Sequence, residues 1–330
     1  MTNIGILGAG TWGVALARLL ANKGENVTVW SALPSEVKEL AETRRHRNLP
    51  KMIIPDSIVF TEDMKTACDG MDVIVFAVPS VFMRSTASKA KPYIKENQII
   101  VSVAKGFETE TLLTMTEIIE SEIGHSERIV ALSGPTHAEE VSIDLPTMIV
   151  SACESSDNAH KVQDLFGTEN MRVYTNSDIH GVELCGALKN VLALAAGMSA
   201  GLGYGDNAKA ALITRGVVEL SRLGEAMGCN SHTFYGLAGI GDLVVTATSR
   251  HSRNNQAGIL IGQGMSAKEA TEKVGMVVEG LNALEGAVKL SKRYGVEMPI
   301  VEAVDAIVNH GADPRDVVGQ LMGRRKKDEF

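Results

Sequence analysis

The chain has 330 residues, of which 45% are hydrophobic and 22% charged, and 32 basic against 40 acidic residues give a net charge of −8. This length exceeds what one hydrophobic core usually supports, and the composition excludes a disordered chain. A net negative chain is a poor candidate for nucleic-acid binding, because that affinity comes largely from neutralising phosphates. We therefore expect two folded domains and no nucleic-acid partner.

The sequence predicts a cytoplasmic protein without membrane insertion. No apolar run reaches the ~18 residues of a membrane span, and the first residues lack the basic and apolar regions of a signal peptide. The four cysteines, at positions 68, 153, 185 and 229, have no paired spacing. This pattern fits a reducing compartment and argues against both a disulfide framework and a zinc site.

A glycine-rich motif opens the chain. An apolar strand is expected over residues 4–7, a helix over 14–21 and a second strand over 27–30, with Gly8-x-Gly10-x-x-Gly13 at the first turn. In this context the motif indicates a dinucleotide site: Gly8 permits the tight turn, Gly10 the approach of a pyrophosphate and Gly13 close helix packing. The amides of Thr11 and Trp12 begin the helix, where an anion is favoured.

Further apolar runs alternate with helical segments such as 112–123. The expected strands are 71–78, 99–103, 128–133 and 147–152. Near-continuous β-branched runs of this kind predict a parallel sheet covered by helices on both faces.

Beyond about residue 180 the pattern becomes helical. The expected helices are 182–198, 208–227, 252–262, 266–274, 279–294 and 301–310. The predicted fold is thus an α/β Rossmann-type doubly wound sheet followed by an all-α domain. We expect a dinucleotide-binding domain over residues 1–184 and a helical substrate-binding domain over 185–330.

The coenzyme preference is not decided by the sequence. Sites for NAD usually carry an acid about 20 residues after the glycines, at the end of the second strand. Here that position falls on Trp30-Ser31-Ala32, which offers neither an acid nor an arginine. The cluster 44–47 (Arg-Arg-His-Arg) is interpreted first as a charged helix face. Both NAD(H) and NADP(H) stay open, with a slight lean towards tolerance of NADP(H).

Turns that follow the expected strands supply candidate ligand contacts. They are Pro79-Ser80, the segment around Lys105, and the segment 133–138 with Gly134, Thr136 and Ala138. In an open α/β sheet ligands bind beyond the carboxyl ends of the strands, so we expect these turns to line one cleft. Lys105 is placed there to contact an anion or a polarised oxygen; the alternative is a surface lysine.

Two polar residues interrupt the apolar helix expected around residue 190. Lys189 and Asn190 are costly there without partners, so Lys189 is expected to face a polar cavity or to have a lowered pKa. Either suits acid–base catalysis. The alternative is a lysine on an exposed stripe. Asp242 is expected in a glycine-bracketed turn over 239–243.

A phosphate site is predicted where the helix after residue 252 begins. Ser252 has the character of an N-cap, with Arg253 and Asn254 in the first turn. A helix N-terminus with an arginine favours a phosphate. Glu279 is interpreted either as a ligand for a hydroxyl or as a first-turn acid. No histidine, His137 included, has neighbours at metal-binding spacing, so no metal site is expected.

Eight ordered motifs resemble the bacterial NAD(P)-dependent glycerol-3-phosphate dehydrogenase family. They are GAGTWG (8–13), AKGFE (104–108), SGPTHAEE (133–140), GALKN (186–190), AGIGDL (238–243), SRN (252–254), VVEG (277–280) and GVEMPI (295–300). The resemblance implies an enzyme that interconverts dihydroxyacetone phosphate and sn-glycerol 3-phosphate for phospholipid synthesis.

The resemblance also implies site residues. Nucleotide contacts fall on Thr11, Trp12, Lys105, Ala138, Arg253, Val277 and Glu279. Substrate contacts fall on Lys105, Gly134, Thr136, Lys189, Asp242, Ser252, Arg253 and Asn254. The proton donor falls on Lys189. Many family members carry Arg or His just after the second strand, where this sequence has Ser31-Ala32.

The expected mechanism combines the inferences from the residues with those from the family resemblance. Lys189 protonates the alkoxide formed at C2 of a phosphorylated small-molecule substrate, and Lys105 adds positive potential. Asp242 positions a substrate hydroxyl or Lys189. Two other functions stay open: a two-domain dehydrogenase acting on a hydroxy acid, and a non-catalytic NAD(H)-sensing protein. A homodimer is the expected assembly, since helical second domains often bury a face against a copy.

Overall fold

The chain forms two compact units in the computed structural model, Met1–Glu183 and Leu184–Phe330. Residues 1–249, 251–326 and 328–329 are described. This division lies one residue from the expected domain boundary, while the assignment of nucleotide and substrate binding to separate domains stays a prediction.

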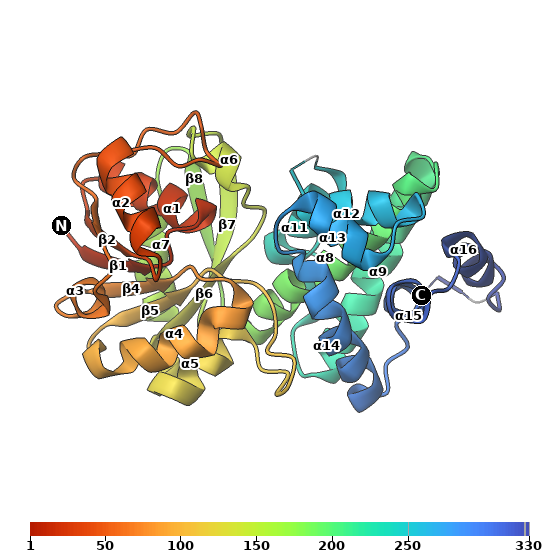
Figure 1. Ribbon diagram of the computed structural model, residues 1–330. Helices are drawn as coiled ribbons and strands as arrows, with labels where there is room; N and C mark the ends of the chain where they lie inside the picture. Colours follow the sequence, from red (N-terminus) through yellow and green to blue (C-terminus); the bar gives the residue numbers. More distant parts are fainter. Residues whose placement is uncertain (250, 327, 330) are drawn as a thin grey trace. The chain divides into compact units, whose positions relative to one another are not determined.

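The first unit is built on an eight-stranded sheet in the order β3-β2-β1-β4-β5-β6-β7-β8 (Figure 1). The strands are β1 (Asn3–Leu7), β2 (Asn26–Trp30), β3 (Val59–Thr61), β4 (Val73–Phe76), β5 (Ile99–Ser102), β6 (Ile129–Ser133), β7 (Thr147–Ala152) and β8 (Met171–Asn176). β1 pairs in parallel with both β2 and β4, so the chain order reverses beside β1. Such a reversal opens a crevice at the carboxyl ends of the strands.

Helices cover both faces of this sheet, as Figure 1 shows. They are α1 (Thr11–Asn22), α2 (Pro34–Thr43), α3 (Met64–Cys68), η1 (Ser80–Phe82), α4 (Met83–Ala90), η2 (Lys91–Tyr93), α5 (Met115–Ile123), η3 (Ser126–Arg128), α6 (Ala138–Val141) and α7 (Ser156–Phe166). One apolar cluster joins the sheet to α1, α2, α6 and α7, and a second joins it to α3, α4 and α5. The α/β fold class predicted from the sequence is confirmed.

The sheet differs from the sequence prediction in two respects. β3 and β8 were not predicted; β8 alternates buried and exposed residues from Met171 to Tyr174, so it lacks the continuous apolar run of a central strand. The sheet is also not wholly parallel, because β6 and β7 pair antiparallel. β7 and β8 therefore point their carboxyl ends to the opposite edge from β1, β4, β5 and β6.

The second unit is helical among its described residues. Its elements are α8 (Ile179–Gly201, which begins in the first unit), α9 (Asp206–Ala226), α10 (Ser231–Phe234), η4 (Leu237–Gly241), α11 (Asp242–Thr248), α12 (Arg253–Gly262), α13 (Ala267–Val274), α14 (Glu279–Tyr294), α15 (Pro299–His310) and α16 (Pro314–Met322). α16 was not predicted. α8 is long and apolar enough to cross a membrane, but 89% of its apolar stretch is buried in the protein, as in a core helix.

Glycines allow α8 and α12 to pack with their backbones in contact. A Cβ at Gly197 would lie 2.2 Å from the Asn255 carbonyl oxygen, and one at Gly258 would lie 2.2 Å from the Leu194 carbonyl oxygen. Gly201 and Gly262 make equally close approaches one turn further on. No side chain fits at these four positions, so the glycines set the separation of α8 and α12.

We expect Gly258→Ala to destabilise the protein by about 1–3 kcal/mol, because the added methyl group overlaps a backbone carbonyl. Gly319→Ala in α16 is the matched control. A Cβ at Gly319 meets nothing within 4 Å, so helix propensity alone should stabilise that variant by up to ~1 kcal/mol. Urea unfolding followed by circular dichroism measures both; equal effects of the two substitutions would contradict the packing argument.

The carboxylate of Glu219 in α9 caps the start of α15. Its two oxygens accept hydrogen bonds from the Ile300 amide at 2.9 and 3.1 Å, and the side chain is buried. Burial raises the pKa of Glu219 to about 7, although the bonds from the Ile300 and Val301 amides oppose the shift. Glu219 therefore holds a proton in the folded state over a pH range in which it ionises in the unfolded chain.

The contribution of Glu219 to the stability of the protein should therefore fall with rising pH. A raised folded-state pKa contributes stability below the unfolded pKa, and this contribution is lost as pH rises through the folded pKa of about 7. Relative to Glu219→Gln, which keeps an acceptor but does not titrate, the wild type should lose up to about 3 kcal/mol between pH 4.5 and 7.5. Urea unfolding of both at several pH values tests this; parallel pH profiles would contradict it.

Candidate active site

The glycine motif lies where the sequence placed it, between β1 and α1. Gly8 has φ +127°, and a Cβ there would lie 2.6 Å from the Ala77 carbonyl oxygen. A Cβ at Gly13 would lie 2.1 Å from the Gly8 carbonyl oxygen, whereas one at Gly10 would point into open space. The loop is thus packed against β4 on one side and open on the other.

The start of α1 has the features of an anion site. Gly10 is the N-cap and supplies no side-chain bond, and the first turn holds no acid. The amides of Thr11 and Trp12 therefore meet the open side of the loop with the positive end of the helix dipole. These residues fit the pyrophosphate of a dinucleotide coenzyme.

The end of β2 carries an acid that the strand sequence does not reveal. The Ser31 hydroxyl donates to a carboxylate oxygen of Glu36 at 2.5 Å, and Glu36 lies in the first turn of α2. The Gly8 amide donates to the Trp30 carbonyl oxygen at 2.9 Å, which places this end of β2 beside the glycine loop. Residues 30–32 alone do not reveal this acid, because Glu36 belongs to α2 and the turn between β2 and α2 brings it to the end of the strand.

The basic cluster after α2 does not form a helix face, so that interpretation was wrong. α2 ends at Thr43, and Arg44 takes the left-handed conformation at φ 51°. Arg44 donates to the Ile58 carbonyl oxygen at 2.8 Å and Arg45 to that of Met52 at 3.4 Å. Both guanidinium groups hold the loop that leads to β3.

At the carboxyl ends of β5 and β6, two of the predicted turns meet. Lys105 Nζ donates to the Gly134 carbonyl oxygen at 3.0 Å and to the Thr136 hydroxyl at 3.4 Å. Lys105 is half-buried, so its stem is covered while its ammonium group contacts these two oxygens. Ala138 begins the short helix α6 that follows.

An arginine from α4 fixes the loop that carries Lys105. Arg84 binds both carboxylate oxygens of Glu108 at 2.6 Å, and it reaches Glu122 of α5 at 2.7 Å. The bonds from Arg84 hold the pKa of Glu108 below its usual range. The loop between β5 and α5 is thus tied to two helices.

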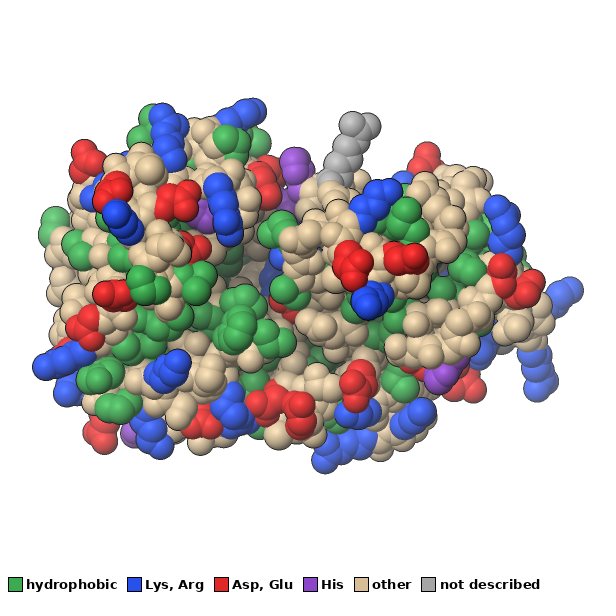
Figure 2. Space-filling model, in the orientation of Figure 1, with side chains coloured by type: hydrophobic (Ala, Val, Ile, Leu, Met, Phe, Trp, Pro, Cys, Tyr) green, Lys and Arg blue, Asp and Glu red, His purple; other side chains and the backbone are tan. Residues whose placement is uncertain are grey.

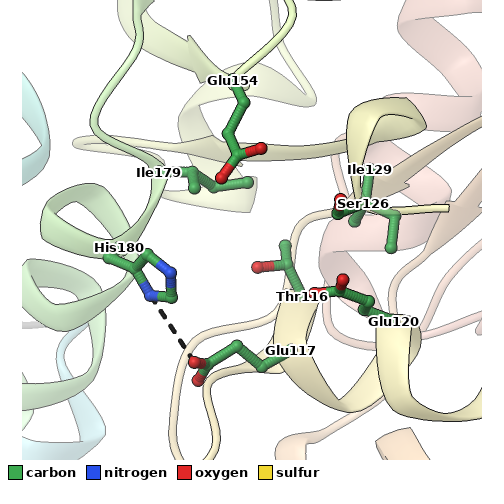
Figure 3. A pocket seen from close by; sticks show the side chains of 8 residues that line it. All are labelled: Thr116, Glu117, Glu120, Ser126, Ile129, Glu154, Ile179 and His180. Atoms are coloured by element: carbon green, nitrogen blue, oxygen red, sulfur yellow. Dashed lines mark ion pairs between the residues drawn. The ribbon is translucent and has the colours of Figure 1, made fainter. Parts of the chain in front are cut away.

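A separate pocket lies at the opposite edge of the sheet. Glu154 follows β7, Ile129 begins β6, and His180 of α8 is 3.7 Å from Glu117 of α5 (Figure 3). Because β7 runs against β6, these residues are at the amino ends of the parallel strands, away from the glycine loop. No group of three metal-binding side chains occurs among the described residues.

Lys189 is buried in α8 with two partners in α11. Its side chain is about 7% exposed, and Nζ forms an ion pair with Asp242 Oδ1 and donates to the Thr246 hydroxyl at 2.6 Å. Thr246 in turn donates to the Asp242 carbonyl oxygen at 2.7 Å. An exposed-stripe location for Lys189 is therefore wrong, because the side chain is buried and has two polar partners.

The sequence predicted a turn at Asp242, but the structure has a helix there. The preceding residues Leu237–Gly241 form one π-helical turn, and Asp242 begins α11. A Cβ at Gly239 would lie 2.0 Å from the Phe234 carbonyl oxygen, so only glycine fits there. Single π-turns are frequent at functional sites, and the one before α11 directly precedes the acid that meets Lys189.

The predicted phosphate site lies at the start of α12. The Ser252 hydroxyl accepts the Asn255 amide at 3.2 Å, which confirms the N-cap, and Arg253 is exposed. The Asn254 side chain donates to Asn190 Oδ1 at 2.9 Å and accepts the Gly280 amide at 2.8 Å. Asn254 thus joins the starts of α12 and α14 to the residue beside Lys189.

This link gathers the other predicted residues of the second unit. Glu279 is the first residue of α14, Val278 is its N-cap, and Val277 is 44% exposed just before it. Lys189, Ser252, Arg253 and Glu279 therefore lie on helices that meet around Asn254. Arg250, close to this segment in sequence, lies outside the described residues.

Comparison with known proteins agrees with this arrangement. The family model for the N-terminus of NAD-dependent glycerol-3-phosphate dehydrogenase matches residues 3–159, and the model for its C-terminus matches residues 178–319. The chain belongs to this family. These two matches confirm the resemblance found in the sequence.

Full-length relatives carry the same name. The chain is 62% identical to glycerol-3-phosphate dehydrogenase [NAD(P)+] 2 of Lactobacillus delbrueckii subsp. bulgaricus, over 100% of this chain and 99% of that protein. It is 51% identical to the enzyme of Agathobacter rectalis, over 100% and 98%. A crystal structure of glycerol-3-phosphate dehydrogenase from Coxiella burnetii has a TM-score of 0.93 and 36% identity, over 98% and 99%.

We expect Arg84→Lys to loosen the loop that carries Lys105, because lysine keeps the charge but cannot bind both oxygens of Glu108. Amide exchange over residues 105–113 should speed up about tenfold, which corresponds to a local loss of about 1.4 kcal/mol. Lys38→Ala is the control, since Lys38 and Glu42 are exposed and 3.9 Å apart. Unchanged exchange in Arg84→Lys would show that the pair does not order the loop.

Proposed function

We propose that the protein catalyses the reversible reduction of dihydroxyacetone phosphate to sn-glycerol 3-phosphate with NADH or NADPH. The product serves glycerophospholipid synthesis. Family membership supports the reaction, and one observation supports the residue roles: a buried lysine held by a carboxylate and a hydroxyl. A binding protein that only senses the coenzyme has no need of such a group.

Lys189 is the proposed proton donor and acceptor. When bound, the reduced coenzyme would supply the hydride that C2 of the ketone receives. Lys189 Nζ, as an ammonium group, gives a proton to the C2 oxygen and becomes a neutral amine, which regains its proton from solvent. In the reverse direction the amine removes the hydroxyl proton. Asp242 and Thr246 hold Nζ in one position, so the proton is always offered from the same place.

Substrate contacts are proposed for two groups of residues. Lys105 binds a substrate oxygen, together with the Gly134 backbone and the Thr136 hydroxyl group beside it. Its positive charge stabilises the negative charge that develops on that oxygen. Ser252, Arg253 and Asn254 bind the phosphate. Because both ends of the Asn254 side chain already have partners, its contribution to the phosphate comes from its backbone amide at the helix start.

Coenzyme contacts are proposed at three places. Gly8, Gly10, Thr11, Trp12 and Gly13 hold the pyrophosphate. Lys105 and Ala138 are proposed contacts at the strand ends, and Arg253, Val277 and Glu279 are proposed contacts at the starts of α12 and α14. The compartment proposed is the cytoplasm and the assembly a homodimer. On the face shown in Figure 2 acidic and basic side chains are interspersed, which agrees with a small-molecule partner rather than nucleic acid.

Turnover is measured as loss of the nicotinamide absorbance with dihydroxyacetone phosphate and either coenzyme. Lys189→Met should lower kcat by about 10²–10⁴-fold, because the general acid is lost. Its Kd for NADH, from nicotinamide fluorescence, should change little. Near-normal turnover in Lys189→Met would refute the role of Lys189.

A second variant distinguishes loss of the general acid from misfolding. It is needed because Lys189→Met leaves Asp242 buried without its ion pair. The double variant with Lys189→Met and Asp242→Asn restores neutrality and should fold and bind NADH, yet remain as slow. Absence of turnover in the wild type, with both coenzymes bound, would refute the proposed reaction itself.

A further inference from the structure

The residues at the carboxyl end of β2 determine how the adenosine ribose of a nucleotide is bound. In sheets of this kind the first ribose of the coenzyme meets the carboxyl end of the second strand, next to the glycine loop. Here the Gly8 amide binds the Trp30 carbonyl oxygen, so Ser31 is the first residue beyond that junction. Ser31 is 5% exposed, and its amide donates to the Thr61 carbonyl oxygen at 3.1 Å.

The Ser31 hydroxyl forms its hydrogen bonds with protein groups, Glu36 among them, and not with solvent. Its hydroxyl proton is committed to Glu36 Oε2 at 2.5 Å, and its oxygen accepts the Leu33 amide at 3.2 Å. Glu36 is therefore held at the strand end by a hydrogen bond across five residues. Among the described residues Glu36 Oε1 accepts no hydrogen bond, so one oxygen is available to a ligand.

Other groups place Glu36 close to the glycine loop. His46 is buried, and burial lowers its pKa; the Glu36 carboxylate and a hydrogen bond to the Ala9 carbonyl oppose this shift. His46 thus lies between Glu36 and the Ala9 backbone of the glycine motif. This is where the 2′ substituent of the adenosine ribose separates NADH from NADPH.

Building on the proposed function, we propose that Glu36, held by Ser31, makes the protein selective for NADH over NADPH. The carboxylate Oε1 accepts a hydrogen bond from the 2′-hydroxyl of NADH. The same charge repels the 2′-phosphate of NADPH, which would bring a second anion against it.

The basic residues nearby do not offset this repulsion. Arg44 is occupied by the Ile58 carbonyl oxygen and stacks over Phe60 at 5.7 Å. Arg45 is occupied by the Met52 carbonyl oxygen. Arg47, which contributes to the lowered pKa of His46, is the one nearby cation without a partner among the described residues. Arg47 is exposed and is a single cation against a carboxylate fixed by a short hydrogen bond.

The test measures the Kd of NADH and of NADPH by nicotinamide fluorescence, without substrate. The wild type should bind NADH at least about tenfold more tightly, since a hydrogen bond to a charged group contributes about 1.5–3 kcal/mol. Glu36→Gln keeps the length of the side chain and an acceptor but removes the charge. It should tighten NADPH binding and bring the ratio of the two Kd values close to one.

Glu39→Gln is the matched control. It removes the same charge from α2, but Glu39 is exposed and its side chain has no link to Ser31, so the ratio should stay at the wild-type value. Ser31→Ala releases Glu36 without removing its charge, and it should lower the preference to an intermediate ratio. A purely structural role of Glu36 as a first-turn acid would change the melting temperature but not this ratio.

The outcomes separate the inference from the proposed function. Equal Kd values for NADH and NADPH in the wild type, or an unchanged ratio in Glu36→Gln, would overturn the inference while turnover of dihydroxyacetone phosphate leaves the proposed function standing. Failure to bind either coenzyme would overturn both. Steady-state kcat/KM values for the two coenzymes provide the second readout and should follow the Kd ratio.

Discussion

The core of the helical unit contains a buried positive charge, the ammonium group of Lys189, and the packing around it must compensate this charge. Burying the Lys189 ammonium group is costly unless an opposite charge and further hydrogen bonds compensate it. Asp242 and Thr246 provide both from α11. The π-turn over Leu237–Gly241 sets where α11 begins, and the glycine contacts hold α12 against α8. The packing of these helices is thus inseparable from the position of one lysine.

Much of this was predictable because the signals are local. The glycine motif needs only one strand, one turn and one helix, and all are adjacent in sequence. Lys189 and Asn190 were conspicuous because polar residues are costly in an apolar helix. The structure assigns each a partner: Lys189 meets Asp242, and Asn190 meets Asn254. Contact with Lys189 was one of the two roles expected of Asp242, whereas the pairing of Asn190 with Asn254 is a tertiary contact that no local pattern contains.

The features missed by sequence reasoning depend on tertiary context. β8 buries alternate residues only, and its pairing with β7 is what makes it a strand. The antiparallel step between β6 and β7 follows from how the chain returns after α6, which apolar runs cannot express. Glu36 differs from these cases, because it contacts Ser31 only five residues away, through the turn from β2 into α2 and not from the strand end itself.

Three half-buried or buried glutamates show how structural and recognition roles differ. The Glu183 carboxylate accepts both the amide and the hydroxyl of Thr116, at the start of α5. Glu219 directs both oxygens to the Ile300 amide at the start of α15. In each case a helix start uses both oxygens, and nothing is left for a ligand. Glu36 is also in a helix start, but Ser31 engages only one of its oxygens. A carboxylate that is fixed by one oxygen and open at the other is oriented for an incoming hydroxyl, and it repels an incoming phosphate.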